Sequence, residues 1–213
     1  GAAVNGGTQI LLQSGTLSGS FYGGGNAADV QGNTFVSAYW AIMSGAFYGG
    51  GNNGTVTGNA SVEITAGVSG NWGGFEGEIY GGGNNGGVTG DTAVTLGHGD
   101  YLGNIYGGGN GAGGTVGGGT LVQLSGGTPK VTGDIYGGGN GGAAVTGSAA
   151  VGLSNGNAVI AGDVYGGGRN SVVSGGTMVN AAGGTAGGIH GGGSGSAASV
   201  MNGAEVKVGG NLR

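Results

Sequence analysis

The chain has 213 residues, of which 66 are glycine, one is proline and none is cysteine, and its formal net charge is −5. So much glycine without proline or a strict triplet period excludes collagen, and the lack of cysteine excludes disulfides and a cysteine-based zinc site. Four basic residues cannot form a nucleic-acid-binding face, and no run of about 20 apolar residues is present that would span a membrane.

The first predicted elements are two strands that begin at Val4 and recur eight times along the chain. In each copy, five residues separate a valine from a second valine or isoleucine, and one more residue separates that from an apolar residue. The second part alternates with period two, which is typical of strands and not of helices. A glycine lies two residues after the first valine in seven copies, and we expect it to turn the chain at positive φ. The first copy is Val4, Ile10 and Leu12, and the last is Val200, Val206 and Val208.

The loop that follows each Val-x-Leu strand varies most between repeats. In three successive repeats it carries both tryptophans and one of the two histidines. Aromatic faces with a few carboxylates suit sugar binding, and variable loops on a rigid scaffold often carry function. One hypothesis is therefore a glycan-binding edge, and the other is that the loops only shield the core. The candidate ligand-binding residues are Trp40, Trp72, Phe75, Glu76, His98, Asp100 and Tyr101.

A hexapeptide closes each repeat, in which an apolar residue and an aromatic residue precede three glycines and a polar residue. Alternation places the apolar residue in the core and the aromatic residue outside, on the same side as the residue before the pair. We therefore expect an outer ladder of aromatic rings, next to a flat glycine strip and a ladder of hydrogen-bonded asparagines. The ladder residues are Tyr22, Tyr48, Tyr80, Tyr106, Tyr136, Tyr165 and His190, and they are 25 to 32 residues apart.

Polar residues precede these apolar-aromatic pairs in the central repeats. Glu78, Asn104, Asp134 and Asp163 form a column, for which we expect solvated side chains, with attraction of Ca²⁺ as the alternative. Arg169 stands where the other repeats have asparagine and should interrupt the asparagine ladder.

Periodicity at this length indicates stacked units, and here it predicts an all-β fold. We expect a parallel β-solenoid of about seven coils, with 25–32 residues per coil and no helices, that forms a single domain over residues 1–213. Continuous hydrogen bonding between coils would allow so many glycines in strands. At about 4.8 Å per coil the rod would be about 35 Å long. The chain starts without methionine or a signal peptide, so we expect a segment of, or a subunit in, a longer fibre.

Enzyme activity is not expected. Glu76 and Asp100 could form an acid pair, but no cluster of acids with lysine or arginine accompanies them, so neither catalytic residues nor a metal or cofactor are predicted. A polysaccharide lyase is therefore disfavoured. An ice-binding face would need a regular threonine ladder, and the one formed by Thr57, Thr89, Thr146 and Ser174 is interrupted by Gln31 and Gly117.

The pattern YGGGN, then VTGN or VTGD, then VxL, with low charge and no cysteine, resembles the glycine-rich β-strand repeats of bacterial cell-surface proteins of the adhesin and autotransporter-passenger kind. The resemblance extends from Val4 to Val208. It implies an extracellular or cell-surface location and a structural role in a fibre or stalk, with a carbohydrate-binding adhesin module as the alternative. Coils without charged caps at either end also predict homo-oligomers that stack end to end into filaments.

Overall fold

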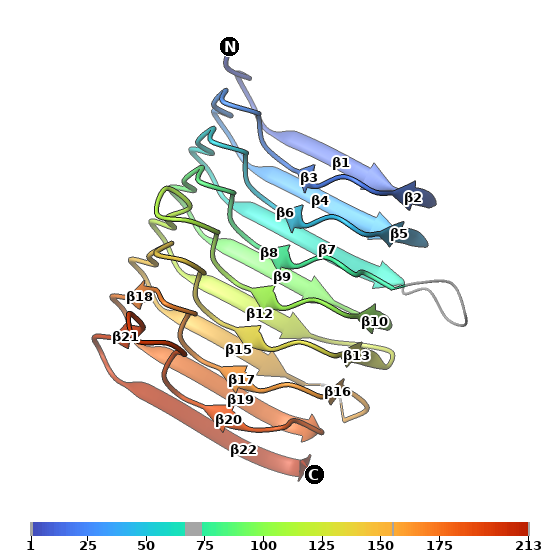
Figure 1. Cartoon of the computed structure of the whole chain (residues 1–213), viewed down its shortest axis with the longest axis vertical. Coiled ribbons are helices and arrows are strands. Elements are labelled where there is room, and N and C mark those ends of the chain that lie inside the picture. The colour runs from blue at the N-terminus through green and yellow to red at the C-terminus, as the bar shows by residue number, and fades with distance from the viewer. Residues whose placement is uncertain (1, 67–73, 155, 213) are drawn as a thin grey trace.

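The computed structural model describes residues 2–66, 74–154 and 156–212. Within these residues the chain is an all-β parallel solenoid of about seven turns without helices, as predicted. The two ends of the chain lie at opposite ends of the stack (Figure 1). Each turn runs through a long strand, an edge segment, a two-residue return strand and a glycine-rich corner.

One side of the solenoid is an eight-stranded parallel sheet. Its register aligns the predicted Val-x-Leu positions of every repeat: Ile10 pairs with Val36, for example, and Val62 with Val94. The predicted strand phase is therefore confirmed along the whole sheet. The strands, in sheet order, are β1 (Thr8–Leu12), β4 (Thr34–Tyr39), β7 (Ala60–Ala66), β9 (Thr92–Leu96), β12 (Thr120–Leu124), β15 (Ala149–Leu153), β19 (Thr177–Gly184) and β22 (Ala204–Leu212).

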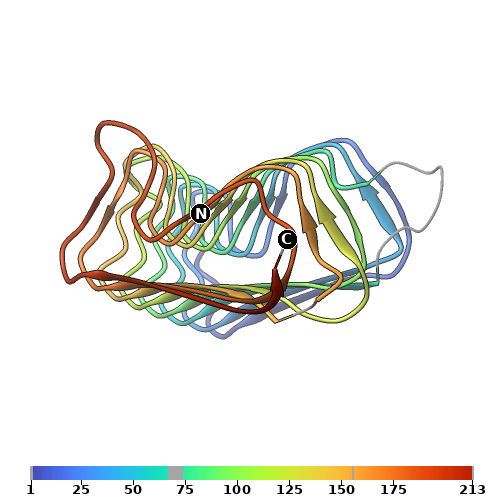
Figure 2. The same cartoon turned by 90° about the horizontal axis from the view of Figure 1, so that it is seen from below.

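The opposite side carries seven two-residue return strands, one per hexapeptide. Seen along the stack, this side is indented, whereas the eight-stranded sheet is flat (Figure 2). The return strands are β3 (Phe21–Tyr22), β6 (Phe47–Tyr48), β8 (Ile79–Tyr80), β11 (Ile105–Tyr106), β14 (Ile135–Tyr136), β17 (Val164–Tyr165) and β20 (Ile189–His190).

Short strands also stack along both edges. At one edge the first valine of each repeat bridges to its equivalent in the next, as Val56 does to Val88, and this column ends in paired β18 (Val172–Val173) and β21 (Ser199–Val200). At the other edge, where we expected loops, short parallel strands form instead. They are β2 (Gly15–Leu17), β5 (Ala41–Met43), β10 (Gly99–Tyr101), β13 (Pro129–Val131) and β16 (Val159–Ile160).

The main core lies between the two sheets. Val94 and Leu96 from the long strands and Ile105 from a return strand have no exposed surface. Buried threonines at the start of long strands join the two sheets, because their hydroxyls donate to glycine carbonyls on the return side. Thr34 does so to Gly49 at 2.7 Å and Thr120 to Gly137 at 2.5 Å. The burial of Val94 and Leu96 confirms the predicted ladders of inward Val and Leu.

The corner glycines serve a different purpose from the one predicted. Of the seven glycines two residues after a first valine, Gly6 has positive φ, whereas Gly58 and Gly90 do not. A Cβ on Gly90 would instead collide with the Asn59 side chain and lie 2.8 Å from the Gly58 carbonyl oxygen. The prediction of positive φ is thus wrong for most repeats, because the close approach of neighbouring coils requires glycine there.

Candidate functional site: a buried tyrosine column

The hexapeptides place six tyrosines and His190 in one continuous stack. Adjacent ring centroids lie 4.6 to 5.0 Å apart, and adjacent ring planes differ by 6 to 13°. The in-register return strands cause this spacing, since each ring sits above its equivalent in the neighbouring coil. Stacked aromatic pairs contribute about 0.5–1.5 kcal/mol each beyond the area they bury, so the column also stabilises the stack.

The predicted exposure of this ladder is wrong. Tyr80 is 1% exposed and Tyr106 is fully buried. The tyrosines form a cluster of their own, while the isoleucines before them belong to the main core, so the two side chains point to opposite faces of each return strand. Rings above and below, and polar side chains on both sides, cover the column. His190, at one end, is exposed.

Acidic side chains border the column on one side and accept hydrogen bonds from it. The Tyr80 hydroxyl donates to Glu78 at 2.5 Å and the Tyr136 hydroxyl to Asp134 at 3.0 Å. Asp134 also accepts the Asp163 backbone N–H at 2.9 Å. These two carboxylates are half-buried and hydrogen-bonded to tyrosines, so they are only partly solvated, whereas the Asp163 side chain is 39% exposed.

Asparagine side chains border the column on the other side and form the predicted ladder. Each Nδ2 donates to the Oδ1 of the asparagine one coil closer to the N-terminal end, over 2.8 to 3.1 Å. Asn140 also donates to the Tyr80 hydroxyl at 3.3 Å. At the next position Arg169 stands in place of asparagine, and its guanidinium forms a hydrogen bond with the Tyr106 hydroxyl. The ladder members are Asn26, Asn52, Asn84, Asn110 and Asn140.

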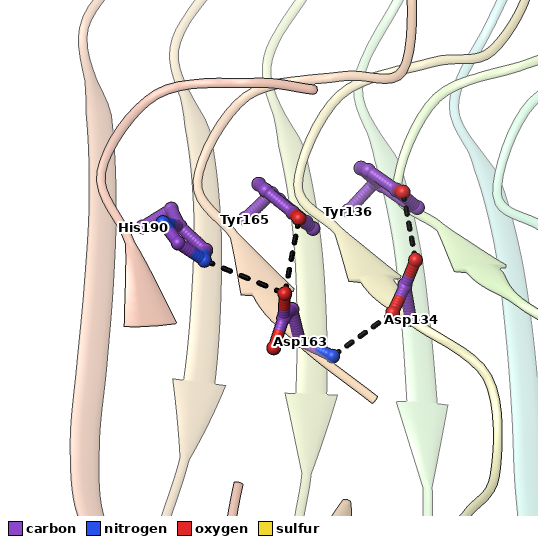
Figure 3. A network of polar contacts seen from close by, with 5 residues as sticks. All are labelled: Asp134, Tyr136, Asp163, Tyr165 and His190. Carbon is purple, nitrogen blue, oxygen red and sulfur yellow. Dashed lines mark hydrogen bonds and ion pairs between the residues drawn. The ribbon is translucent and has the colours of Figure 1, made fainter. Parts of the chain in front are cut away.

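A contact between His190 and Asp163 completes the C-terminal end of the column (Figure 3). His190 Nε2 lies 3.5 Å from Asp163 Oδ2, and the imidazole stacks on Tyr165 with centroids 4.6 Å apart. The Tyr165 hydroxyl donates to the same carboxylate oxygen at 3.2 Å. The His190 and Asp163 side chains are 49% and 39% exposed, so a neighbouring molecule could contact this end of the column.

Burial of the column changes the titration of its phenols. The pKa of Tyr48 is raised to about 12, mainly by burial and to a smaller extent by electrostatic interactions with Tyr22 and Glu78. Burial and the hydrogen bond to Glu78 raise the pKa of Tyr80, and burial raises that of Tyr106. The folded state therefore favours the neutral phenol, so this contribution to stability is complete below the unfolded pKa of about 10 and is lost as pH rises towards the folded values.

We accordingly expect the free energy of unfolding to fall steeply between about pH 10 and pH 12. Each buried tyrosine should contribute a slope of up to about 1.4 kcal/mol per pH unit in this window. Denaturant titrations from pH 9 to pH 12 would measure the slope, and Tyr80→Phe should reduce it because one titrating group is removed. A stability that stays constant to pH 12 would show that the rings are open to solvent.

The candidate glycan-binding residues do not form one surface. Phe75 and Tyr101 are 2% and 1% exposed, stack 5.6 Å apart and belong to the main core. The Tyr101 hydroxyl donates to the Gly97 carbonyl at 3.2 Å. These two rings shield the core and offer no face to a sugar. Trp40, by contrast, is 50% exposed and packs edge-on against Tyr39 at 5.8 Å.

The remaining candidates on this edge are polar or lie outside the described residues. Glu76 is exposed and Asp100 is half-buried, and Asp100 pairs with Lys130 in the register of β10 and β13. His98 Nδ1 lies 2.7 Å from the Thr128 hydroxyl. Trp72 falls in 67–73, outside the described residues. Among the residues that the structure describes, no three His, Asp or Glu side chains are grouped so that they could hold a metal ion, and no helix is long and apolar enough to cross a membrane.

Comparisons with known proteins add no further assignment. No protein-family model, curated protein or solved structure matches the chain. The β-solenoid fold of about seven turns is therefore established by the repeat and the structure alone.

Proposed function

We propose that this protein is an extracellular structural solenoid that forms, or belongs to, a surface fibre or stalk through end-to-end stacking of its coils. The exposure of the end coils carries the proposal. Val206 and Val208 of β22 are 41% and 60% exposed, whereas the equivalent Val94 and Leu96 in the middle of the stack are fully buried. Another coil of the same repeat would cover such inward-facing side chains, and a second copy of this chain has coils of that kind to offer.

The distribution of charge supports the same proposal. Edge strands that must avoid pairing with other chains usually carry charged side chains. The first charged side chain in the sequence is Asp29, so β1 has none. In β22, Glu205 and Lys207 neutralise each other at 3.2 Å. A head-to-tail contact of this kind does not close on itself and yields a filament. The extracellular location rests on the resemblance to glycine-rich surface repeats.

Light scattering and electron microscopy of the purified protein test this proposal. We expect fibres one molecule wide. Val206→Lys should prevent them, because assembly would bury the new charge, whereas Met178→Lys should not, since Met178 is an exposed residue of β19 on the outer face of the sheet. A parent protein that remains a monodisperse monomer at high concentration would contradict the proposal.

A second candidate function is carbohydrate binding at the edge near β5. The observation in its favour is the exposed pair Tyr39 and Trp40, with Trp40 held at a positive φ of 57°. Trp40→Ala should then abolish binding on a glycan array without changing the circular dichroism spectrum. If the parent protein binds no glycan on the array, the edge has only its covering role.

A further inference from the structure

The central part of the tyrosine column has the geometry of an electron-transfer path. From Tyr80 to Tyr165, adjacent ring centroids lie 4.7 to 5.0 Å apart and adjacent ring planes differ by 6 or 7°. Near-parallel rings at this separation are offset-stacked, and contact between their π systems allows an electron to pass from one ring to the next. Each such step advances by one coil, so a series of steps runs along the axis of the rod.

Carboxylates beside these rings can take up the protons that oxidation releases (Figure 3). A phenol that loses one electron becomes a strong acid, so it is readily oxidised only where a base is within reach of its hydroxyl. The Tyr136 hydroxyl donates to Asp134 Oδ2 at 3.0 Å. The Tyr165 hydroxyl donates to Asp163 Oδ2 at 3.2 Å. In both pairs the proton already lies in a hydrogen bond to its acceptor.

One carboxylate, Glu78, contacts two neighbouring phenols. Its Oε2 accepts the hydrogen bond of the Tyr80 hydroxyl at 2.5 Å, and its Oε1 accepts that of the Tyr106 hydroxyl at 3.5 Å. A proton received from one phenol can therefore be returned to it while the other phenol gives up its own. The net charge of the three groups stays constant during such an exchange, which avoids the cost of placing a new charge in a buried site.

We propose that the column from Tyr80 to Tyr165 carries electrons along the rod by successive one-electron oxidation of its tyrosines. The partner is a one-electron oxidant strong enough to oxidise a phenol, such as an oxidised metal complex. The residue two positions before the tyrosine is Ser20 in the first hexapeptide repeat and Ala46 in the second. Neither is a carboxylate, so the proton-accepting part of the column begins at Tyr80. This function requires only one molecule and does not depend on end-to-end assembly.

Each step of this transfer balances in electrons and protons. Tyr80 loses one electron to the oxidant, which is reduced, and its proton moves to Glu78, leaving a neutral tyrosyl radical. Tyr106 then gives one electron to that radical. Tyr80 recovers its proton from Glu78, and the Tyr106 proton passes to the same carboxylate. The radical has advanced by one coil, and the next step moves it to Tyr136, whose proton passes to Asp134.

The surroundings of the column protect the radical from loss. Tyr80, Tyr106 and Tyr136 are 1%, 0% and 2% exposed, so water and dissolved reductants have little access to their rings. Tyr101 is also buried, but it belongs to the main core on the other face of the return strands. Its hydroxyl donates to the Gly97 carbonyl, which cannot take up a proton. Tyr101 is therefore a matched control, a buried tyrosine outside the path.

Flash oxidation from a tethered photo-oxidant tests the path. Ser44 is exposed and lies four residues before Tyr48, and because the chain has no cysteine, Ser44→Cys would carry the only label. A ruthenium bipyridine complex attached there becomes a one-electron oxidant when light and a soluble quencher remove its electron. Tyr165→aminotyrosine places a more easily oxidised reporter several coils away. We expect an aminotyrosyl radical in electron paramagnetic resonance spectra, formed at a rate independent of protein concentration.

Substitutions in this labelled protein separate transfer through the column from direct oxidation. Tyr106→Phe keeps an aromatic ring in the stack but removes the phenol between Tyr80 and Tyr136, so the reporter radical should be lost. Tyr101→Phe should leave its yield unchanged. Asp134→Asn keeps the size of the side chain but cannot take up the Tyr136 proton, so the radical should arrive more slowly.

The possible results decide the proposal without reference to assembly. Equal reporter yields with and without Tyr106→Phe would overturn it, and so would the absence of a reporter radical in the labelled protein with its column intact. An unchanged rate in Asp134→Asn would overturn the role of the carboxylate. Thermal melts of every variant show that the solenoid is folded during the measurement. Because dilute single molecules suffice, a negative result here leaves the proposed fibre untouched, and a protein that never forms fibres leaves this path untouched.

Discussion

Replacing Val94 with aspartate should lower the free energy of unfolding by about 4 kcal/mol or more. Val94 is fully buried and pairs with Val62 on one side and Val122 on the other. The carboxylate would have no hydrogen-bond donor among these apolar neighbours, so it would have to be buried uncharged or force the coil open. Chemical unfolding followed by circular dichroism would measure the change.

The neighbouring residue provides a matched control for this substitution. Ala93 lies on the same strand with its side chain on the outer face, half-buried, and pairs with Ser61 and Leu121. Ala93→Asp should therefore change stability by less than about 0.5 kcal/mol, as surface substitutions usually do. If Val94→Asp and Ala93→Asp unfold alike, the inward and outward faces of β9 have been assigned incorrectly.

Adding one methyl group to the centre of a hexapeptide should destabilise the protein by about 3 kcal/mol, at the upper end of what overpacking costs. In Gly138→Ala the new Cβ would lie 2.8 and 2.9 Å from the backbone nitrogen and Cα of Gly168 and 3.1 Å from a methyl group of Val173. Backbone atoms of the next coil cannot move aside independently, because they are hydrogen-bonded on both sides. A thermal melt against the parent would detect the loss.

Gly192 is the matching control, because it occupies the same place in the last hexapeptide. A Cβ there meets nothing within 4 Å, and its φ is not in the left-handed region. Gly192→Ala should be neutral or should stabilise the monomer by about 0.4–1 kcal/mol through a less flexible unfolded chain. Equal destabilisation by the two substitutions would mean that backbone conformation, and not contact between coils, requires glycine in this motif.

Sequence periodicity was sufficient to predict the register of the solenoid. The spacing of Val4, Ile10 and Leu12 recurs in every repeat, and because each coil stacks directly on the last, equal spacing means equal height in the sheet. The asparagine ladder followed for the same reason. Identical polar residues at one position of a stacked coil have only each other as neighbours along the axis.

Burial of the tyrosine column could not be predicted in the same way. Alternation gives the side of a strand on which Tyr106 lies, but not whether the chain folds back to cover that side. The indentation of the return face depends on tertiary geometry (Figure 2). A signal was nevertheless present, since Glu78, Asp134 and Asp163 each stand two residues before a tyrosine, where a carboxylate can accept the bond of a buried phenol.

The burial of two aromatic residues at the candidate binding edge could not be predicted either. Phe75 and Tyr101 resemble surface aromatics in the sequence because glycines and polar residues surround them. In the structure each lies at the same height as its equivalent in the adjacent coil, as the bridges from Met43 to Phe75 and from Phe75 to Tyr101 show. Their shared position is hidden in the sequence, because more residues separate Ile64 from Phe75 than separate Leu96 from Tyr101.

The asparagine ladder gives the rod an electrical direction. All four of its hydrogen bonds run the same way, from an amide nitrogen to the oxygen one coil nearer the N-terminal end. The side-chain amide dipoles therefore add along the axis, as peptide dipoles do in a helix, and neighbouring bonds in such a chain polarise one another. Two rods that meet head to tail align these dipoles, whereas two that meet head to head oppose them. A fibre built from this protein would thus have distinguishable poles, and its two tips should differ in how readily they accept the next molecule.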